Sequence, residues 1–326
     1  MNRSNHTLHR FAAATLLGIA SLAAPAASAL AQTPLRLIVG FPSGATLDTV
    51  TRAIAEGMRA GFERPIVVEN RPGGGGLAAA LFVKSAAPDG NTLLMAPLGT
   101  LLQPHSVKAA QFNPLTDFAP VTQAGTFDIA FAVGVGVPAY TLQEYVALVK
   151  KEPRRGDFAS AAAGSLPHFF ALMFAQSAGI KLTHIPYKGT APAIAAIMGG
   201  EVSLLSTTSA DIGAQVKSGR LRALAVSSAQ RSPSLPDAPT LRELGYSIEG
   251  SAWYGFFAPA TTPPAALQKL NLAVTSAIND RATAERMRSM GVLPAATTPA
   301  AFAAILKQDY ERWGAVIRAS GFKADE

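Results

Sequence analysis

The sequence predicts an α/β protein built from two α/β units, with the second unit inserted into the first. Short apolar strands alternate with helical patterns at a regular interval along most of the chain. The texture of the sequence changes near Phe127, where the second unit begins. The last two helical patterns have no strands of their own to cover. We expect these helices to pack back onto the first unit, which makes that unit discontinuous.

Three predicted strands and two helices make up the first part of unit one. The run 35–41 is apolar enough for a buried strand, and the turn 42–45 leads into a helix over 46–60. A second strand over 65–69 is followed by a Gly-rich turn, a helix over 77–86 and a third strand over 91–95. This alternation is typical of a parallel sheet with crossover helices.

The second unit repeats the alternation with its own strands and helices. Thr141 is the expected N-cap of its first helix, and Gly179 is expected to end the next one. The strands are predicted over 129–135, 157–161, 183–187, 201–206 and 221–226, and the helices over 141–151, 167–178 and 191–198. Beyond a Pro/Ser-rich stretch at 232–239, an aromatic strand over 253–258 returns to unit one. Helices over 264–279 and 299–320 complete the chain.

The first 31 residues are predicted to be a signal peptide. Arg3 and Arg10 give a positive charge to the segment before the apolar run 11–24. Small residues, Ala29 and Ala31, stand at the two positions that signal peptidase recognises. The apolar run is shorter than the roughly 20 residues that a bilayer needs, which weighs against a transmembrane anchor. We expect cleavage after Ala31, export to the periplasm, and a soluble mature chain that is not inserted into the membrane.

Composition excludes several classes of site. The chain has no Cys, which removes disulfides, thiolate metal sites and Cys nucleophiles together. The mature part retains 26 basic and 21 acidic residues, and this mildly basic balance would attract anionic solutes to a cleft. The basic cluster Lys150, Lys151, Arg154 and Arg155 fits a solvated helix end better than a nucleic-acid surface. We expect no nucleic-acid partner, no cofactor and no bound metal, and we expect the protein to be a monomer.

Three segments share one design, a strand followed by a small-residue turn at the start of a helix. They are 41–48, 162–168 and 187–192, with Ser165 and Thr190 as the expected N-caps of the second and third helices. Free backbone N–H groups at such helix starts bind anions, and Gly and Ala let a ligand approach the backbone. Capped helices also occur in every α/β protein, so it is the recurrence of the design that favours binding. Together they predict a carboxylate site that needs no Arg.

These segments belong to a longer series of motifs. The series comprises FPSGATLD (41–48), VENRPG (68–73) with the Gly run after it, APDGNTLL (87–94), DFAPV (117–121), HIPYKG (184–189), RSPSLPD (231–237) and WYG (253–255). In this order the motifs resemble the Bug-type receptors of the tripartite tricarboxylate transporter family over essentially the whole mature chain. The resemblance implies a two-lobed type II periplasmic binding protein, or "Venus flytrap". With the discontinuous first unit expected from the order of elements, lobe 1 is predicted at 32–128 plus 251–326 and lobe 2 at 129–250. It also implies a solute-binding receptor that passes a small carboxylate to a membrane permease.

The chain departs from the family pattern at positions that bear on specificity. Ser43 and Ala45 stand where the family usually has Pro and Gly, and Ser203 and Thr207 stand where it commonly has Asp. We hypothesise that the missing acids near Thr207 disfavour ligands with an ammonium group. Tighter binding of aspartate than of succinate would contradict this hypothesis.

The predicted ligand-binding residues follow from the helix starts and the resemblance together. Asp48, inside the first helix, is expected to organise the loop or hold water. His168 is weighed equally as a cleft donor and as a packed core histidine. The full set is Ser43, Gly44, Ala45, Thr46, Asp48, Gly73, Gly99, Thr100, Ala163, Gly164, Ser165, His168, Tyr187, Lys188, Gly189 and Thr207.

Other function classes fit the sequence less well. Gly73, Gly75 and Ala78 fit a Gly-x-Gly-x-x-Ala nucleotide fingerprint, but the acid expected about 20 residues later is missing. Ser43 fails the Gly-x-Ser-x-Gly pattern of a serine hydrolase. No catalytic residue is therefore predicted, and the protein is expected not to be an enzyme. A ligand sensor that feeds a signalling partner stays open, because such a receptor has the same fold.

Overall fold

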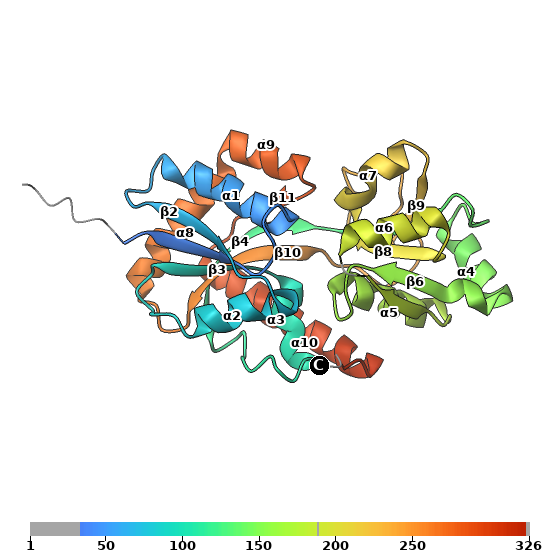
Figure 1. The fold of residues 1–326 in the computed structure, drawn as a ribbon, viewed down its shortest axis with the longest axis horizontal. Coiled ribbons are helices and arrows are strands. Elements are labelled where there is room, and N and C mark those ends of the chain that lie inside the picture. The colour runs from blue at the N-terminus through green and yellow to red at the C-terminus, as the bar shows by residue number, and fades with distance from the viewer. Residues whose placement is uncertain (1–32, 188, 324–326) are drawn as a thin grey trace, which may run out of the picture. The chain divides into compact units, whose positions relative to one another are not determined.

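The computed structural model describes residues 33–187 and 189–323. The predicted signal peptide and Lys188 lie outside the described residues. Residues 33–323 fall within one compact unit that contains two sheets. Figure 1 shows these sheets with their helices as two lobes.

The first lobe is built on a six-stranded sheet with the order β11-β4-β10-β3-β1-β2. β1 pairs in parallel with β2 and β3, whereas β10 runs antiparallel to β3 and β4. The strand bounds are β1 Leu35–Val39, β2 Ile66–Asn70, β3 Thr92–Pro97, β4 Phe118–Phe127, β10 Ala252–Pro259 and β11 Leu293–Pro294. The carboxyl ends of β1 and β3 therefore lie together at one edge, where ligands bind in open α/β sheets.

Helices from both ends of the chain cover this sheet. The final helices pack against β4 and against α1, as expected for a discontinuous lobe, and in Figure 1 the orange α9 lies beside the blue α1 while the red α10 lies beside the blue-green α3. The α-helices are α1 Thr46–Arg59, α2 Leu77–Lys84, α3 Leu98–Leu102, α8 Pro264–Asn279, α9 Arg281–Ser289 and α10 Pro299–Ser320, and the 3-10 turns are η1 Gly74–Gly76 and η2 Gln103–His105. The side chains of Trp253, Phe257 and Phe302 form part of the buried core.

The second lobe is built on a five-stranded sheet with the order β7-β6-β8-β5-β9. β6 pairs in parallel with β7 and β8, and β5 runs antiparallel to β8 and β9. The strands are β5 Ile129–Gly134, β6 Asp157–Ser160, β7 Thr183–Pro186, β8 Leu204–Thr208 and β9 Leu221–Val226. The helices are α4 Leu142–Lys151, η3 Pro153–Gly156, α5 Leu166–Ala178, α6 Thr190–Gly199 and α7 Ser209–Lys217.

The chain passes between the sheets at Asp128, which separates β4 from β5, and again where the segment after β9 leads into β10. Both passages are tied to the second lobe by hydrogen bonds. The Asp128 carboxylate accepts from Ser232, and Ser227 Oγ donates to the Gly250 carbonyl at 2.8 Å. The lobe boundaries at 128/129 and 250/251 stay a prediction. β4 ends and β5 begins next to the first boundary, and β10 begins next to the second.

Most elements match the sequence prediction, and the differences are local. Thr141 and Ser165 are N-caps as expected, accepting hydrogen bonds from Glu144 N–H and His168 N–H. The prediction that Thr190 is the N-cap of α6 is wrong, because Gly189 is the N-cap and Thr190 is the first helical residue. Gly189 has a φ of 109°, which an L-residue rarely adopts. The elements missed by the prediction are β4, β11, α3, α7, α9 and the 3-10 turns.

Candidate ligand-binding site

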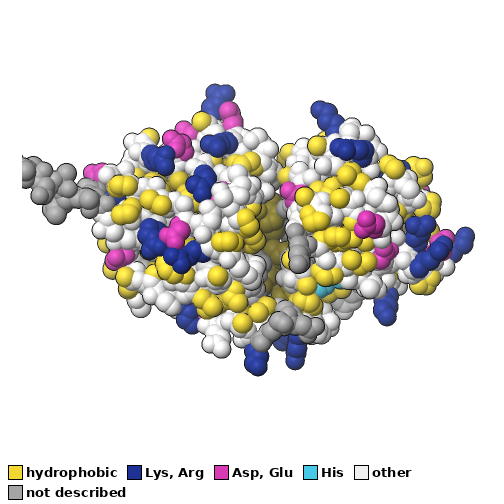
Figure 2. Space-filling view, in the orientation of Figure 1, with side chains coloured by type: hydrophobic (Ala, Val, Ile, Leu, Met, Phe, Trp, Pro, Cys, Tyr) yellow, Lys and Arg dark blue, Asp and Glu magenta, His cyan; other side chains and the backbone are white. Residues whose placement is uncertain are grey.

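A cavity of about 290 Å³ lies between the lobes. That volume is near the lower end of the range of about 300–1,000 Å³ found for small-molecule sites, which suits a small solute. Figure 2 shows the groove between the lobes, with apolar side chains along it. The lining residues from the first lobe are Phe41, Ala45, Thr46, Leu47, Gly75, Pro97, Gly99, Thr100, Gln103, Phe127 and Tyr254, and those from the second are Ala161, Ala162, Ala163, Gly164, Ser165, Leu166, Pro167, Thr190, Thr208 and Asp211.

The start of α1 forms part of the first-lobe wall. Its N-cap is Ala45, which has no side-chain group that could accept a hydrogen bond from the first turn. The backbone N–H groups of a first helical turn lack partners within the helix, and the helix dipole adds partial positive charge there. Because Thr46 and Leu47 line the cavity, this end of it suits an anionic group.

The second lobe contributes two further helix starts to the same cavity. At α5, the Ser165 hydroxyl caps the helix, and Pro167 in the first turn has no N–H to offer. At α6, Gly189 caps without a side chain, and Thr190 lines the cavity. Residues from all three predicted segments therefore meet at one cavity, and they come from both lobes.

Asp48 organises the loop before α1 from behind the cavity wall. Its side chain is 1% exposed and accepts hydrogen bonds from Gly44 N–H at 2.9 Å and Asn70 Nδ2 at 2.8 Å, while Arg52 Nε lies 3.0 Å away. Burial works to raise the pKa of Asp48, but the hydrogen bonds from Arg52, Gly44 and Asn70 and the charge of Arg52 hold it below its usual range. Asp48 is thus an ionised structural acid that fixes residues 41–46.

Asp211 is a cavity-lining residue that the sequence reasoning missed. It is in the first turn of α7, and its side chain hydrogen-bonds to the hydroxyls of Thr208, Thr207 and Thr190. Burial raises the pKa of Asp211, and these three hydroxyls oppose that rise. The hypothesis of missing acidity near Thr207 is therefore wrong in its premise, because an acid from the next helix reaches the same place.

Tyr254 is the other titratable group of the cavity lining. Its ring lies 4.5 Å from that of Phe127, centroid to centroid, in the wall next to the first passage between lobes. Burial, and then the charge of Asp211, raise the pKa of the Tyr254 hydroxyl, which therefore stays protonated at neutral pH. Among the described lining residues there is no Lys, Arg or His.

Seven predicted site residues line the cavity, and the others lie elsewhere. The seven are Ala45, Thr46, Gly99, Thr100, Ala163, Gly164 and Ser165. Ser43, Gly44, Asp48, Gly73, His168, Tyr187, Gly189 and Thr207 are outside the lining, and Lys188 is outside the described residues. Several of these support the lining: Gly44 donates to Asp48, and Thr207 hydrogen-bonds to Asp211.

His168 is a packed histidine, 3% exposed, behind the start of α5. Its Nδ1 accepts a hydrogen bond from Gly164 N–H at 3.0 Å, and its ring stacks on His184 with centroids 4.0 Å apart. Ser160 Oγ donates to the Ala162 carbonyl and lies 2.7 Å from His184 Nε2. The two imidazoles therefore hold the 161–165 loop that lines the cavity.

Gly40 is a second support of the site, at the end of β1. A β-carbon at Gly40 would lie 2.5 Å from the Cα of Gly76, and no side chain can move aside to relieve that backbone contact. We expect Gly40→Ala to lower the free energy of unfolding by about 2 kcal/mol through overpacking. Chemical denaturation measures the change.

Gly61→Ala is the matched control for this substitution. A β-carbon at Gly61 meets nothing within 4 Å, so a change within about 0.5 kcal/mol, or a small gain, is expected. Equal losses in the two variants would show that the Gly40–Gly76 contact is not specifically required.

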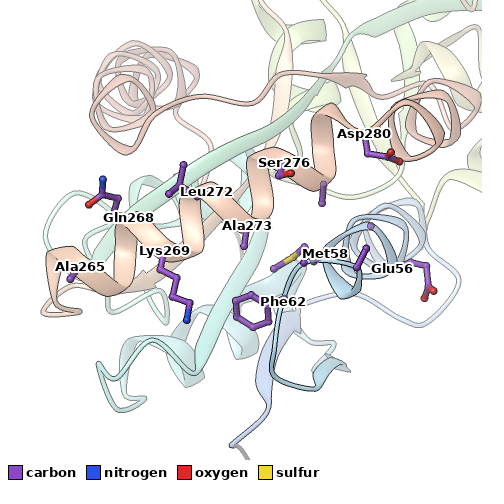
Figure 3. A pocket seen from close by; sticks show the side chains of 14 residues that line it. Glu56, Met58, Phe62, Ala265, Gln268, Lys269, Leu272, Ala273, Ser276 and Asp280 are labelled. Atoms are coloured by element: carbon purple, nitrogen blue, oxygen red, sulfur yellow. The ribbon is translucent and has the colours of Figure 1, made fainter.

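Larger hollows exist on the surface, but they belong to single lobes. The groove in Figure 3, between the end of α1 and α8, has a volume of about 840 Å³. Its wall includes Met58, Phe62 and Leu272, with Lys269 and Glu56 at its rim. The residues at the starts of α1, α5 and α6, which line the inter-lobe cavity, do not line this groove. In the described part of the chain, no three His, Cys, Asp or Glu residues gather in a way that could hold a metal ion.

The comparisons with known proteins agree with this geometry. The family model described as "Tripartite tricarboxylate transporter family receptor" matches residues 50–322. The chain belongs to this family of receptors. It is 31% identical over 315 residues to the protein BugT of Bordetella pertussis, covering 94% of this chain and 95% of BugT.

The fold of this receptor is also similar to solved structures. The periplasmic binding protein BugD has a TM-score of 0.78 at 32% identity, covering 90% of this chain and 99% of BugD. MatC of Rhodopseudomonas palustris, with bound malate, has a TM-score of 0.76 at 29% identity, covering 87% and 98%. The family to which this receptor belongs is one of periplasmic solute-binding proteins, not of enzymes. Within the described residues, no helix has the length and apolar character needed to span a membrane.

Proposed function

We propose that this receptor captures a small carboxylate between its lobes in the periplasm and delivers it to a membrane permease of the tripartite tricarboxylate type. The observation that carries the proposal is the inter-lobe cavity, into which the uncapped start of α1 points its first-turn residues Thr46 and Leu47. Backbone N–H groups recognise a carboxylate without a side-chain cation. The malate bound to MatC supports the same class of ligand.

The proposed mechanism is closure of the lobes over the ligand. The passages at Asp128 and before Ala252 are short, and they are the places where the backbone can bend between the sheets. A ligand favours the closed state only if it contacts both lobes, because an equal affinity for open and closed forms shifts nothing. A micromolar dissociation constant corresponds to about 8 kcal/mol, which is enough to favour the closed form.

The test is a thermal-shift screen of the mature chain with small carboxylates, each paired with its neutral amide. A ligand at about 100 times its dissociation constant adds about 2.7 kcal/mol to the free energy of unfolding, a clear rise in Tm. We expect a rise for some acids and none for their amides. Equal shifts for acids and amides, or shifts only with sugars or nucleotides, would contradict carboxylate capture.

A further inference from the structure

Asp211 brings a carboxyl group to the second-lobe side of the cavity. Three threonine hydroxyls, from Thr208, Thr207 and Thr190, hydrogen-bond to its side chain. The two oxygens of a carboxylate accept about four hydrogen bonds, so the three hydroxyls leave room for one more donor. Asp211 itself lines the cavity and is partly exposed to it.

The first-lobe wall of the cavity carries partial charge of the opposite sign. The start of α1, on the first lobe, offers backbone N–H groups and partial positive charge at Thr46 and Leu47. Apolar side chains also line the cavity, among them Phe41, Phe127 and Leu166. The cavity therefore has the uncapped start of α1 on the first lobe, the acid Asp211 beside the starts of α5 and α6 on the second lobe, and apolar walls that suit a hydrocarbon stem.

A ligand with a carboxylate at each end meets a charge problem here. Its second carboxylate would face Asp211 where the other described lining residues offer no side-chain cation. Two like charges in a partly desolvated cavity repel, unless one of them takes up a proton. An ammonium group at the same place would instead donate a charge-assisted hydrogen bond to Asp211.

We propose that Asp211 makes this receptor prefer ligands with one carboxylate and one cationic amino group over dicarboxylates of the same length. The inference rests on the proposed function, since it names the chemistry of the ligand held in the proposed site. The carboxylate is expected at the start of α1 and the ammonium group at Asp211. The receptor would discriminate between these ligands when its lobes close, because each lobe holds a different end of the ligand.

The first test compares matched ligands on the unmodified mature protein by titration calorimetry. The pairs are β-alanine with succinate and γ-aminobutyrate with glutarate, which differ only in the terminal group, together with aspartate against succinate. We expect the amino acid of at least one pair to bind about tenfold tighter or more. A dicarboxylate that binds as tightly as its amino acid, or more tightly, in every pair would overturn the proposal.

The second test replaces the charge while keeping the shape. Asp211→Asn is expected to weaken the binding of the preferred amino acid by about tenfold or more. The ratio of its affinity to that of the dicarboxylate should fall or reverse. Asp237→Asn is the control, because it removes the same charge from an exposed position of the second lobe. It should leave the preference unchanged. If Asp211→Asn does not fold, the comparison of matched ligands on the unmodified protein still decides.

A third variant separates the role of Asp211 from that of Lys188, which directly precedes Gly189 and the start of α6 in the sequence. Lys188→Gln should retain the preference for amino acids. A preference that changes in Lys188→Gln and not in Asp211→Asn would assign the discrimination to Lys188 and overturn the proposal. Binding of dicarboxylates alone refutes the role of Asp211 but leaves carboxylate capture standing, whereas no binding by any acid refutes both.

Discussion

Lowering the pH from 7 to 5 is expected to reduce the free energy of unfolding by about 3 to 4 kcal/mol through His168 and His184 alone. Burial and the neighbouring His184 lower the pKa of His168 to about 3, and burial lowers that of His184 to about 4. In the unfolded chain both titrate near 6.5. Between these values the unfolded state binds more protons than the folded state, so stability falls as the pH falls.

The pH window follows from the same values. The loss begins near pH 6.5, where the unfolded chain takes up protons, and it levels off near pH 3 to 4, where the folded protein does so too. Each imidazole contributes about 2 kcal/mol at pH 5, since one pKa unit corresponds to about 1.4 kcal/mol. Urea denaturation at a series of pH values measures the slope.

The control keeps the hydrogen bonds and removes the titration. In His168→Asn an amide oxygen can replace Nδ1 as acceptor for Gly164 N–H, and in His184→Gln an amide can replace Nε2 beside Ser160. The double variant should lose most of the slope between pH 7 and pH 5. An unchanged slope would mean that other groups cause the acid sensitivity and that these two histidines are not held neutral.

The alternation of strands and helices could be predicted from the sequence because local patterns determine it. The strand β1 is an apolar run, and the helix α5 has Ser165 before it and Gly179 after it. Such signals act within a few residues and need no knowledge of the rest of the chain. The family motifs then supplied the two-lobed arrangement, which the solved structures of relatives share.

The missed elements are those whose patterns are weak or interrupted. The strand β4 contains Pro120 and the polar pair Thr122 and Gln123, which hide its pairing with β10. The helix α7 buries few apolar side chains, chiefly Ile212, so its periodicity is faint. One signal could have found it: Thr208 followed three residues later by Asp211, an acid in a first helical turn.

The composition of the site depended on tertiary contacts that local patterns do not encode. Asp211 was missed because its helix was missed, although it lies close to Thr207, where the sequence suggested that acids were lacking. His168 lies next to the predicted loop in sequence, but its ring turns inward to stack on His184 from β7. The role of Asp48 was better predicted, since an acid near a helix start commonly has a structural role.

Asp48→Ala is expected to lower the free energy of unfolding by about 3 kcal/mol and to weaken carboxylate binding at least about tenfold. The substitution leaves Gly44 N–H, the Asn70 amide and the Arg52 guanidinium without the carboxylate that they share. Removing one partner from a buried polar network costs about 1–3 kcal/mol for each group left unsatisfied, although water can reach Arg52 and reduce the loss. Chemical denaturation and ligand titration measure the two effects.

Glu56→Ala is the control on the same helix, because Glu56 pairs with Arg59 on the exposed surface of α1. An exposed pair of this kind contributes at most about 1 kcal/mol, and Glu56 lies outside the inter-lobe cavity. Asp48→Asn tests the charge itself: its amide oxygen can still accept from Gly44 N–H, but its attraction for Arg52 is lost. A stability for Asp48→Ala within 1 kcal/mol of the unmodified protein, with ligand affinity retained, would show that the loop before α1 holds its shape without this carboxylate. Carboxylate binding would then depend on the α1 backbone alone.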